Sequence, residues 1–161
     1  MELITLAQSV GGALQQRGLM LATAESCTGG WVAQVMTALP GSSRWFERGF
    51  VTYSNASKCE MLGVGEVTLA QHGAVSEAVA EQMVLGVLRH SRAQVALAIS
   101  GIAGPDGGSL EKPVGTLCLA WGMKDRAVIT RRVQQAGERE AVRQAAVECA
   151  LMGVLALLQE V

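Results

Sequence analysis

The heptapeptide Ala24-Glu25-Ser26-Cys27-Thr28-Gly29-Gly30 separates a β-capable segment from a helical one. Residues 19–23 in front of it are mainly apolar, which is typical of a short strand. Behind it, apolar residues recur at helical spacing: Trp31, Val32, Val35, Met36 and Leu39. Residues 26–30 are therefore predicted to form a strand-to-helix turn, whose free N–H groups can bind an anion or stabilise an oxyanion. A simple helix N-cap is the alternative.

The remaining segments predict an α/β fold in one domain, residues 1–161. Helices are expected at 3–17, 58–62, 77–90 (with Ser76 as N-cap) and 138–160, and strands at 19–23, 50–54, 94–100, 114–122 and 126–134. Helices between strands favour parallel pairs, whereas the last two strands are close enough for an antiparallel hairpin. We expect a three-layer sandwich in which helices cover both faces of a mixed sheet.

Composition excludes several classes of protein. Of the 161 residues, 50% are hydrophobic and 17% charged, which excludes a disordered chain. The net charge of −1 offers no basic face, so we expect no nucleic-acid partner. Apolar stretches are interrupted before 18 positions and residues 1–5 lack a positively charged start, so we expect a soluble, cytoplasmic protein without a membrane partner. The high apolar content favours a homodimer.

Two further polar segments are marked by glycine, Gly49 to Lys58 and Ser100 to Gly108, the latter followed by Lys112-Pro113-Val114-Gly115-Thr116. Together with the heptapeptide, they resemble the CinA C-terminal domain family over nearly the whole chain. Stand-alone members of that family are nicotinamide-nucleotide amidohydrolases. The resemblance implies that nicotinamide mononucleotide is deamidated to nicotinate mononucleotide and ammonia, a reaction of NAD salvage in the pyridine nucleotide cycle, without metal or organic cofactor.

The resemblance also implies a serine–lysine type of site with a tyrosine nearby. Ser26 is the predicted nucleophile, Lys58 its base, and Tyr53 a proton relay or an orienting group. Lys58 can act as a base only if its pKa falls by roughly three units, through burial or a nearby cationic ligand such as the pyridinium ring. The family usually has an acidic residue where this chain has Ala56, which removes one possible partner of the lysine.

The candidate substrate-binding residues lie in the same motifs. Phosphate is expected at the turn or at the glycine-rich loop, and both segments are expected to border one pocket. Ser54 and Asn55 either hold ligand hydroxyls or end a strand, and the arginines of the last helix either clamp phosphate or pair with Glu138 and Glu140. The full set is Thr28, Gly29, Gly30, Ser54, Asn55, Gly101, Gly104, Gly107, Arg139 and Arg143.

Two other interpretations stay open. Cys27 lies beside Ser26 at a predicted helix N-terminus, where a thiolate is favoured, and is the rival nucleophile. The four cysteines form no C-x-x-C pair, so we expect no metal site. The chain is alternatively a nucleotide-binding paralogue with little catalysis, acting as a binding or regulatory module.

Overall fold

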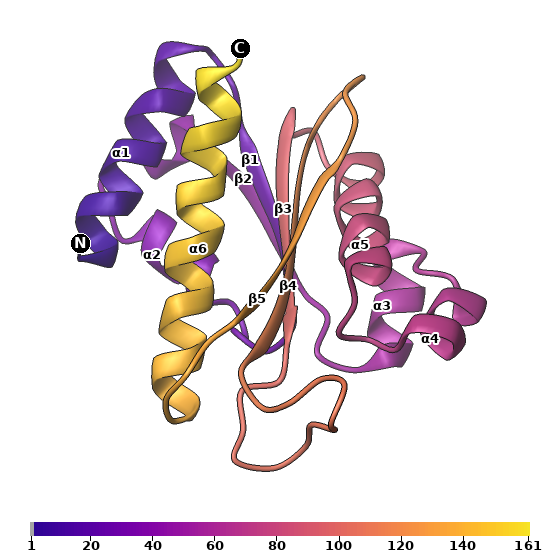
Figure 1. The fold of residues 1–161 in the computed structure, drawn as a ribbon. Coiled ribbons are helices and arrows are strands. Elements are labelled where there is room, and N and C mark those ends of the chain that lie inside the picture. Colours follow the sequence, from indigo (N-terminus) through magenta and orange to yellow (C-terminus); the bar gives the residue numbers. More distant parts are fainter. Residues whose placement is uncertain (1) are drawn as a thin grey trace.

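A five-stranded mixed sheet forms the middle layer of the molecule (Figure 1). The computed structural model describes residues 2–161. The strands are β1 (Leu21–Glu25), β2 (Phe46–Val51), β3 (Val95–Gly101), β4 (Thr116–Met123) and β5 (Ile129–Gln134), in the spatial order β2-β1-β3-β4-β5. β1 is parallel to β2 and β3, whereas β4 is antiparallel to β3 and β5. The predicted mixed sheet with a late antiparallel hairpin is confirmed.

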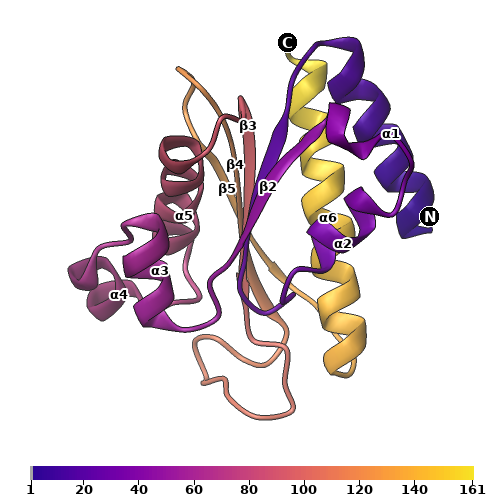
Figure 2. The same ribbon diagram turned by 180° about the vertical axis from the view of Figure 1, so that it is seen from behind.

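Helices cover both faces of this sheet, which confirms the three-layer sandwich (Figures 1 and 2). One layer holds α1 (Leu3–Gln16), α2 (Trp31–Thr37) and α6 (Arg139–Gln159). The other holds α3 (Asn55–Leu62), α4 (Glu66–His72) and α5 (Glu77–His90), and a 3-10 turn, η1 (Ser42–Arg44), precedes β2. The helix 77–90 begins as predicted, since the Ser76 side chain accepts a hydrogen bond from Val79 N.

The two faces of the sheet are filled by residues of different size. Larger residues of β1 and β3, among them Leu21, Leu97 and Ile99, pack under α1, α2 and α6. Alanines that alternate with them pack under α5: Ala22, Ala24, Ala96 and Ala98. Large and small residues alternate because successive side chains of a strand point to opposite faces of the sheet. The small alanines allow α5 to pack close to the sheet.

The expected bounds of two strands are wrong, and one helix was not expected. β1 begins at Leu21 and continues through Glu25, two residues beyond the expected end. β2 begins at Phe46 and ends at Val51, so residues 52–54 leave the sheet. Residues 47–49 are charged or small, which suits an edge strand whose outer side faces solvent. A search for runs of apolar residues therefore misses this part of β2. Helix α4 was not predicted either, because none of its residues is buried.

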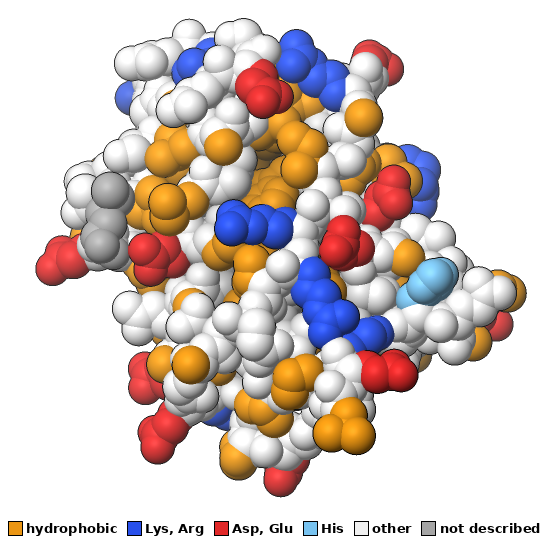
Figure 3. Space-filling view, viewed as in Figure 1, with side chains coloured by type: hydrophobic (Ala, Val, Ile, Leu, Met, Phe, Trp, Pro, Cys, Tyr) orange, Lys and Arg blue, Asp and Glu red, His pale blue; other side chains and the backbone are white. Residues whose placement is uncertain are grey.

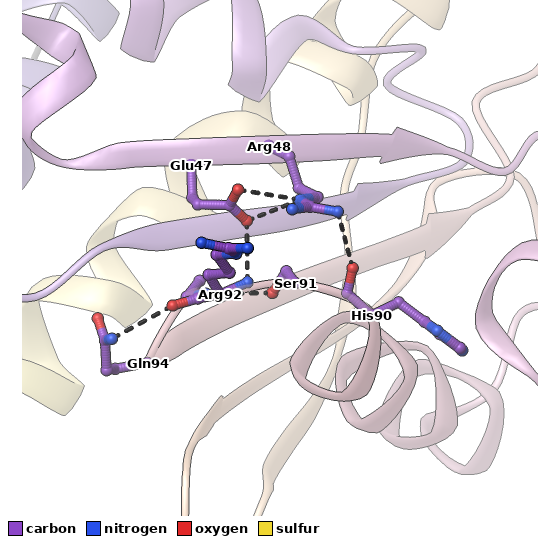
Figure 4. Close-up of polar contacts among 7 residues, drawn as sticks. Glu47, Arg48, His90, Ser91, Arg92 and Gln94 are labelled. Atoms are coloured by element: carbon purple, nitrogen blue, oxygen red, sulfur yellow. Dashed lines mark hydrogen bonds and ion pairs between the residues drawn. The ribbon is translucent and has the colours of Figure 1, made fainter.

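Polar contacts anchor the first half of β2 to the loop between α5 and β3 (Figure 4). The Glu47 carboxylate accepts hydrogen bonds from Arg48 Nε at 2.7 Å and from Arg92 N at 3.1 Å. Arg48 Nη1 donates to the backbone oxygen of His90 at 3.0 Å. These contacts lie at the end of the sheet opposite to the carboxyl ends of β1, β2 and β3, so they fix the edge strand without entering the site described below.

Helix α6 is, among the helices of the described residues, the one long and apolar enough to cross a membrane. Its composition has an explanation within the fold, because it packs on α1 and on the sheet and buries eight of its residues. A hollow lined by apolar and polar side chains separates α6 from β5 (Figure 3).

Gly153 of α6 lies directly against the Trp121 side chain of β4, and its replacement by alanine is expected to destabilise the protein. A Cβ at this position would lie 2.1 Å from Cε2 of Trp121, whose Nε1 donates to the backbone oxygen of Ala150 at 2.8 Å. Such overpacking typically costs about 1–3 kcal/mol, measurable by urea unfolding. Gly12→Ala is the matched control, because that Cβ meets nothing within 4 Å and a helical alanine is preferred. Equal stability of Gly153→Ala and wild type would contradict this packing.

Candidate active site

A cavity of about 190 Å³ lies at the carboxyl ends of the parallel strands β1, β2 and β3. In α/β sheets this edge is the usual place for ligands. The residues that line it are Ser26, Cys27, Tyr53, Asn55, Lys58, Ala74, Val75, Ser100, Gly101, Ala103 and Arg139. All three sequence motifs contribute, which confirms the expectation that the turn after β1 and the glycine-rich loop after β3 border one pocket.

The side chains of Ser26 and Lys58 meet in this cavity. Lys58 Nζ lies 3.0 Å from Ser26 Oγ, 2.8 Å from the backbone oxygen of Thr52 and 3.4 Å from that of Tyr53. The lysine is 1% exposed, and Ser26 is 8% exposed. Burial lowers the pKa of Lys58, because an ammonium ion loses its hydration there, and the nearby Cys27 and Cys59 only partly oppose this effect.

The sequence around Lys58 explains why its long side chain points inward. Ser54 is the N-cap of α3, and its side chain and that of Ser57 form a capping box that fixes the first helical turn. Lys58 follows within this turn and reaches back to the carbonyls of residues 52 and 53. These carbonyls hold the amine in the absence of an acidic residue at position 56. Ser54 thus ends the extended segment and caps a helix.

The turn that carries Ser26 is held by the buried carboxylate of Glu25, the last residue of β1. Glu25 Oε1 accepts hydrogen bonds from Thr28 Oγ1 at 2.7 Å and Val32 N at 2.9 Å, and Oε2 accepts one from Ala33 N at 3.1 Å. The carboxylate thereby caps α2, a role the sequence suggested for a serine or threonine. Within the described residues, the N–H groups of Cys27 and Thr28 have no protein acceptor.

Cys27 also lines the cavity, but its surroundings disfavour a thiolate. Burial raises its pKa to about 11, and this effect exceeds the opposing effect of the Arg143 charge. Gly101 makes room for the sulfur, since a Cβ there would lie 3.0 Å from Cys27 Sγ. The thiol of Cys27 is therefore protonated near neutral pH.

Tyr53 and Arg139 form the outer wall of the cavity. Tyr53 is 61% exposed, and its hydroxyl accepts a hydrogen bond from Arg139 Nη2 at 3.2 Å. Arg139 Nη1 donates to the backbone oxygen of Gly104 at 2.8 Å, which links α6 to the glycine-rich loop. A second cavity of about 490 Å³ adjoins the first at Ala103 and Arg139. Its other lining residues are Gly104, Pro105, Val114, Gly137, Glu138 and Glu140.

Several predicted binding residues lie outside the first cavity. Gly104 lines the second cavity, whereas Thr28, Gly29, Gly30, Ser54, Gly107 and Arg143 line neither. Gly29 and Gly30 adopt positive φ angles of 61° and 104°, which explains why glycine occupies the turn. Among the described residues, neither Arg139 nor Arg143 forms an ion pair with Glu138 or Glu140.

Sequence reasoning missed four residues that line the cavity: Ala74, Val75, Ser100 and Ala103. Ser100 Oγ donates to the backbone oxygen of Ala74 at 2.7 Å, which attaches the segment before α5 to the end of β3. The sequence offers one signal for Ser100, which is a polar residue at the end of an apolar strand. Residues 74 and 75 carry no chemical signal and reach the site through tertiary packing alone. No group of three potential metal ligands occurs within residues 2–161.

This fold and this site define an α/β protein with a buried serine–lysine pair at the carboxyl edge of its parallel strands. The family model described as "CinA C-terminal domain" matches residues 3–158, and the chain belongs to this family. The resemblance inferred from the three motifs is thus confirmed.

Relatives named "Nicotinamide-nucleotide amidohydrolase PncC" resemble the chain over most of its length. The protein from Escherichia coli (strain K12) is 59% identical over 150 residues, which cover 93% of this chain and 91% of the relative. That from Pseudomonas putida is 54% identical over 153 residues and 95% of each chain.

Solved structures of the same family share the fold. The competence/damage inducible protein CihA from Agrobacterium tumefaciens has a TM-score of 0.94 at 46% identity, and the match covers 96% of this chain and 94% of that one. A CinA superfamily protein from Klebsiella pneumoniae 700603 has a TM-score of 0.96 at 38% identity, with full coverage of both chains.

Proposed function

We propose that this protein is an amidohydrolase that converts nicotinamide mononucleotide to nicotinate mononucleotide and ammonia, with Ser26 as nucleophile and Lys58 as base. Relatives at 54–59% identity, named nicotinamide-nucleotide amidohydrolases, support the amidohydrolase activity. The observation that carries the mechanism is the 3.0 Å contact between Ser26 Oγ and a buried lysine. This chemistry needs no metal or organic cofactor.

The surroundings of Lys58 suit a neutral amine. A neutral amine has two N–H groups and one lone pair, and the lysine has three close neighbours. The carbonyls of Thr52 and Tyr53 can only accept, so they take the two N–H groups. In this neutral state the Ser26 hydroxyl donates to the lone pair, which reverses the donation from Nζ to Ser26 Oγ that a charged lysine makes. Burial lowers the pKa of Lys58 and therefore supports this state.

Acylation begins when Ser26 Oγ attacks the carboxamide carbon and passes its proton to Lys58 Nζ. The N–H group of Cys27, which lines the cavity and has no oxygen acceptor among the described residues, is suited to stabilise the oxyanion. Lys58 then donates the proton to the departing nitrogen, and ammonia leaves. In deacylation, Lys58 takes a proton from water, whose oxygen attacks the ester, and returns it to Ser26 as nicotinate mononucleotide is released.

The two adjoining cavities suit the two ends of a mononucleotide. Sites for small molecules typically measure about 300–1,000 Å³, more than the 190 Å³ of the first cavity. The carboxamide end therefore occupies the cavity with Ser26, and the ribose phosphate extends past Arg139 into the second cavity of about 490 Å³. Gly101, Asn55 and Gly104 border this path.

The direct test is incubation of the purified protein with nicotinamide mononucleotide, followed by measurement of ammonia and nicotinate mononucleotide. Equal amounts of both products are expected, and chelator should leave the rate unchanged. Tight binding of the nucleotide without any ammonia would favour the alternative of a binding module. Cytoplasmic location and a homodimer remain predictions, and light scattering checks the second.

Tyr53 is expected to contribute mainly through its ring. Its hydroxyl contacts Arg139, and its backbone oxygen contacts Lys58. A cationic pyridinium ring against the tyrosine face gains about 0.5–2 kcal/mol, so Tyr53→Ala should raise KM by roughly tenfold. Tyr53→Phe keeps the ring and should retain kcat within about tenfold, below the usual worth of a general acid or base. A loss of kcat beyond 10²-fold in Tyr53→Phe would instead identify the hydroxyl as a proton relay.

A further inference from the structure

The side chain of Arg143 binds the turn that carries Ser26, residues 26–30. From α6, its Nε donates to the backbone oxygen of Cys27 at 2.9 Å, and its Nη2 donates to that of Thr28 at 3.2 Å. Its guanidinium carbon lies 5.5 Å from the centroid of the Trp31 ring, within the range of a cation–π contact. Gly29 lies close by, because a Cβ there would be 3.6 Å from Arg143 Nη2. The partners of this side chain are thus all in the turn or at the start of α2.

Glu25 and Arg143 hold the turn in complementary ways. The Glu25 carboxylate accepts from a hydroxyl and two N–H groups at the start of α2, whereas the Arg143 guanidinium donates to two carbonyls of the turn. The N–H groups of Ser26 and Gly29 are satisfied by the backbone oxygens of Ile99 and Ser26. The N–H group of Cys27, directly after Ser26, has no oxygen acceptor among the described residues and belongs to a residue that lines the cavity.

The two hydrogen bonds of the guanidinium act on the backbone next to the Cys27 N–H. They hold the carbonyls of Cys27 and Thr28 from the side of α6. Charge-assisted hydrogen bonds of this kind are about twice as strong as neutral ones. Arg143 therefore fixes the backbone of Cys27, and with it the direction in which the Cys27 N–H points.

We infer that Arg143 is a positioning residue, which holds the backbone of Cys27 so that the Cys27 N–H is oriented as an oxyanion donor. This inference rests on the proposed function, in which Ser26 attacks a carboxamide. It replaces the expectation that Arg143 clamps phosphate, because two of its nitrogens are already bound to the turn.

The test compares Arg143→Lys and Arg143→Met with wild type, with Gln144→Met, an exposed neighbour on α6, as control. Loss of one oxyanion donor costs on the order of 10²–10³ in kcat, so a donor left in place but less well oriented should lose on the order of 10–10². Arg143→Met should show this loss in kcat, with KM for nicotinamide mononucleotide within about threefold. Arg143→Lys keeps the positive charge but cannot donate to both carbonyls as the guanidinium does, so its kcat should lie between those of wild type and Arg143→Met.

Two outcomes would overturn the inference. A rise in KM at unchanged kcat would make Arg143 a phosphate ligand. A lower melting temperature with unchanged kcat would limit it to stabilising the fold, and Arg143→Lys provides the comparison if Arg143→Met does not fold. Gln144→Met should match wild type in all three measurements.

A second measurement separates this inference from the proposed substrate. A fluorophosphonate reacts with an activated serine and places negative charge on an oxygen, but it carries no nucleotide. Labelling of Ser26 should be on the order of tenfold or more slower in Arg143→Met, and absent in Ser26→Ala. Slower labelling with no ammonia from the wild type would reject the substrate and keep the role of Arg143. Equal labelling rates, or a wild type that does not label, would overturn that role.

Discussion

Ser26→Ala is expected to abolish ammonia release, whereas Cys27→Ala retains most of it. The serine hydroxyl lies 3.0 Å from Lys58 Nζ, while burial raises the pKa of the adjacent thiol to about 11, so that almost no thiolate exists near neutral pH. Removing the nucleophile of a serine hydrolase costs on the order of 10⁶ in kcat, and the residue next to it costs little. Steady-state ammonia production by the two variants measures both effects.

The two variants also control for each other, because both remove one heavy atom from the same turn. Circular dichroism and melting temperature should be close to wild type in each, since neither side chain lies among the groups that Glu25 binds. An inactive Cys27→Ala together with an active Ser26→Ala would reverse the assignment. Two inactive but folded variants would indicate that the cavity tolerates no change at either position.

Lys58→Arg is expected to lower kcat by on the order of 10²–10⁴, the usual worth of a general base. Arginine keeps a positive charge but cannot accept a proton near neutral pH. Wild-type kcat should rise with pH along a limb below the ordinary lysine value of 10.5, because burial lowers the pKa of Lys58. Near-normal turnover of Lys58→Arg would show that this residue only binds substrate.

Lys58→Met separates catalysis from stability. It should be as inactive as Lys58→Arg. It should also be more stable than wild type, because methionine fills a similar space and buries no amine that would have to give up its hydration. The gain depends on pH in a definite direction. Between the lowered folded pKa and the ordinary value of 10.5, the unfolded chain binds a proton that the folded chain does not. Wild-type stability therefore rises with pH in this window, and the advantage of Lys58→Met shrinks as pH rises.

Melting temperatures of wild type and Lys58→Met, measured across this range, test the buried amine without any substrate. Ala56→Met, at an exposed position on the same helix, is the control and should track wild type at every pH. A Lys58→Met variant that is less stable than wild type at all pH values would show that the contacts with Thr52, Tyr53 and Ser26 outweigh the cost of burying the amine.

Residues with local physical signatures were predictable from the sequence. The apolar run of β3, the Ser76 cap of α5 and the pairing of β4 with β5 agree with their patterns. The first part of the edge strand β2, residues 46–49, and helix α4 were not, because neither β2 nor α4 has a buried apolar pattern: no residue of either is fully buried.

The site shows the same division between local chemistry and tertiary placement. Ser26 and Lys58 stand out by chemistry and motif, and the structure brings them together across 32 positions of sequence. The buried carboxylate of Glu25 has no signature that separates it from a surface glutamate, because its partners are defined only by the turn itself. Val75 reaches the cavity through the packing of α5, which no local pattern predicts.

The two cavities adjoin at Ala103 and at an exposed arginine, Arg139, which is held by hydrogen bonds to Tyr53 and Gly104. Rotation of an exposed side chain takes picoseconds to nanoseconds, whereas loop or domain movements that admit substrate in other enzymes take microseconds or longer. Rotation of the Arg139 side chain is therefore expected to widen the passage between the two cavities without movement of the backbone. On the proposed function, a nucleotide that enters by this route would need no slow loop or domain movement.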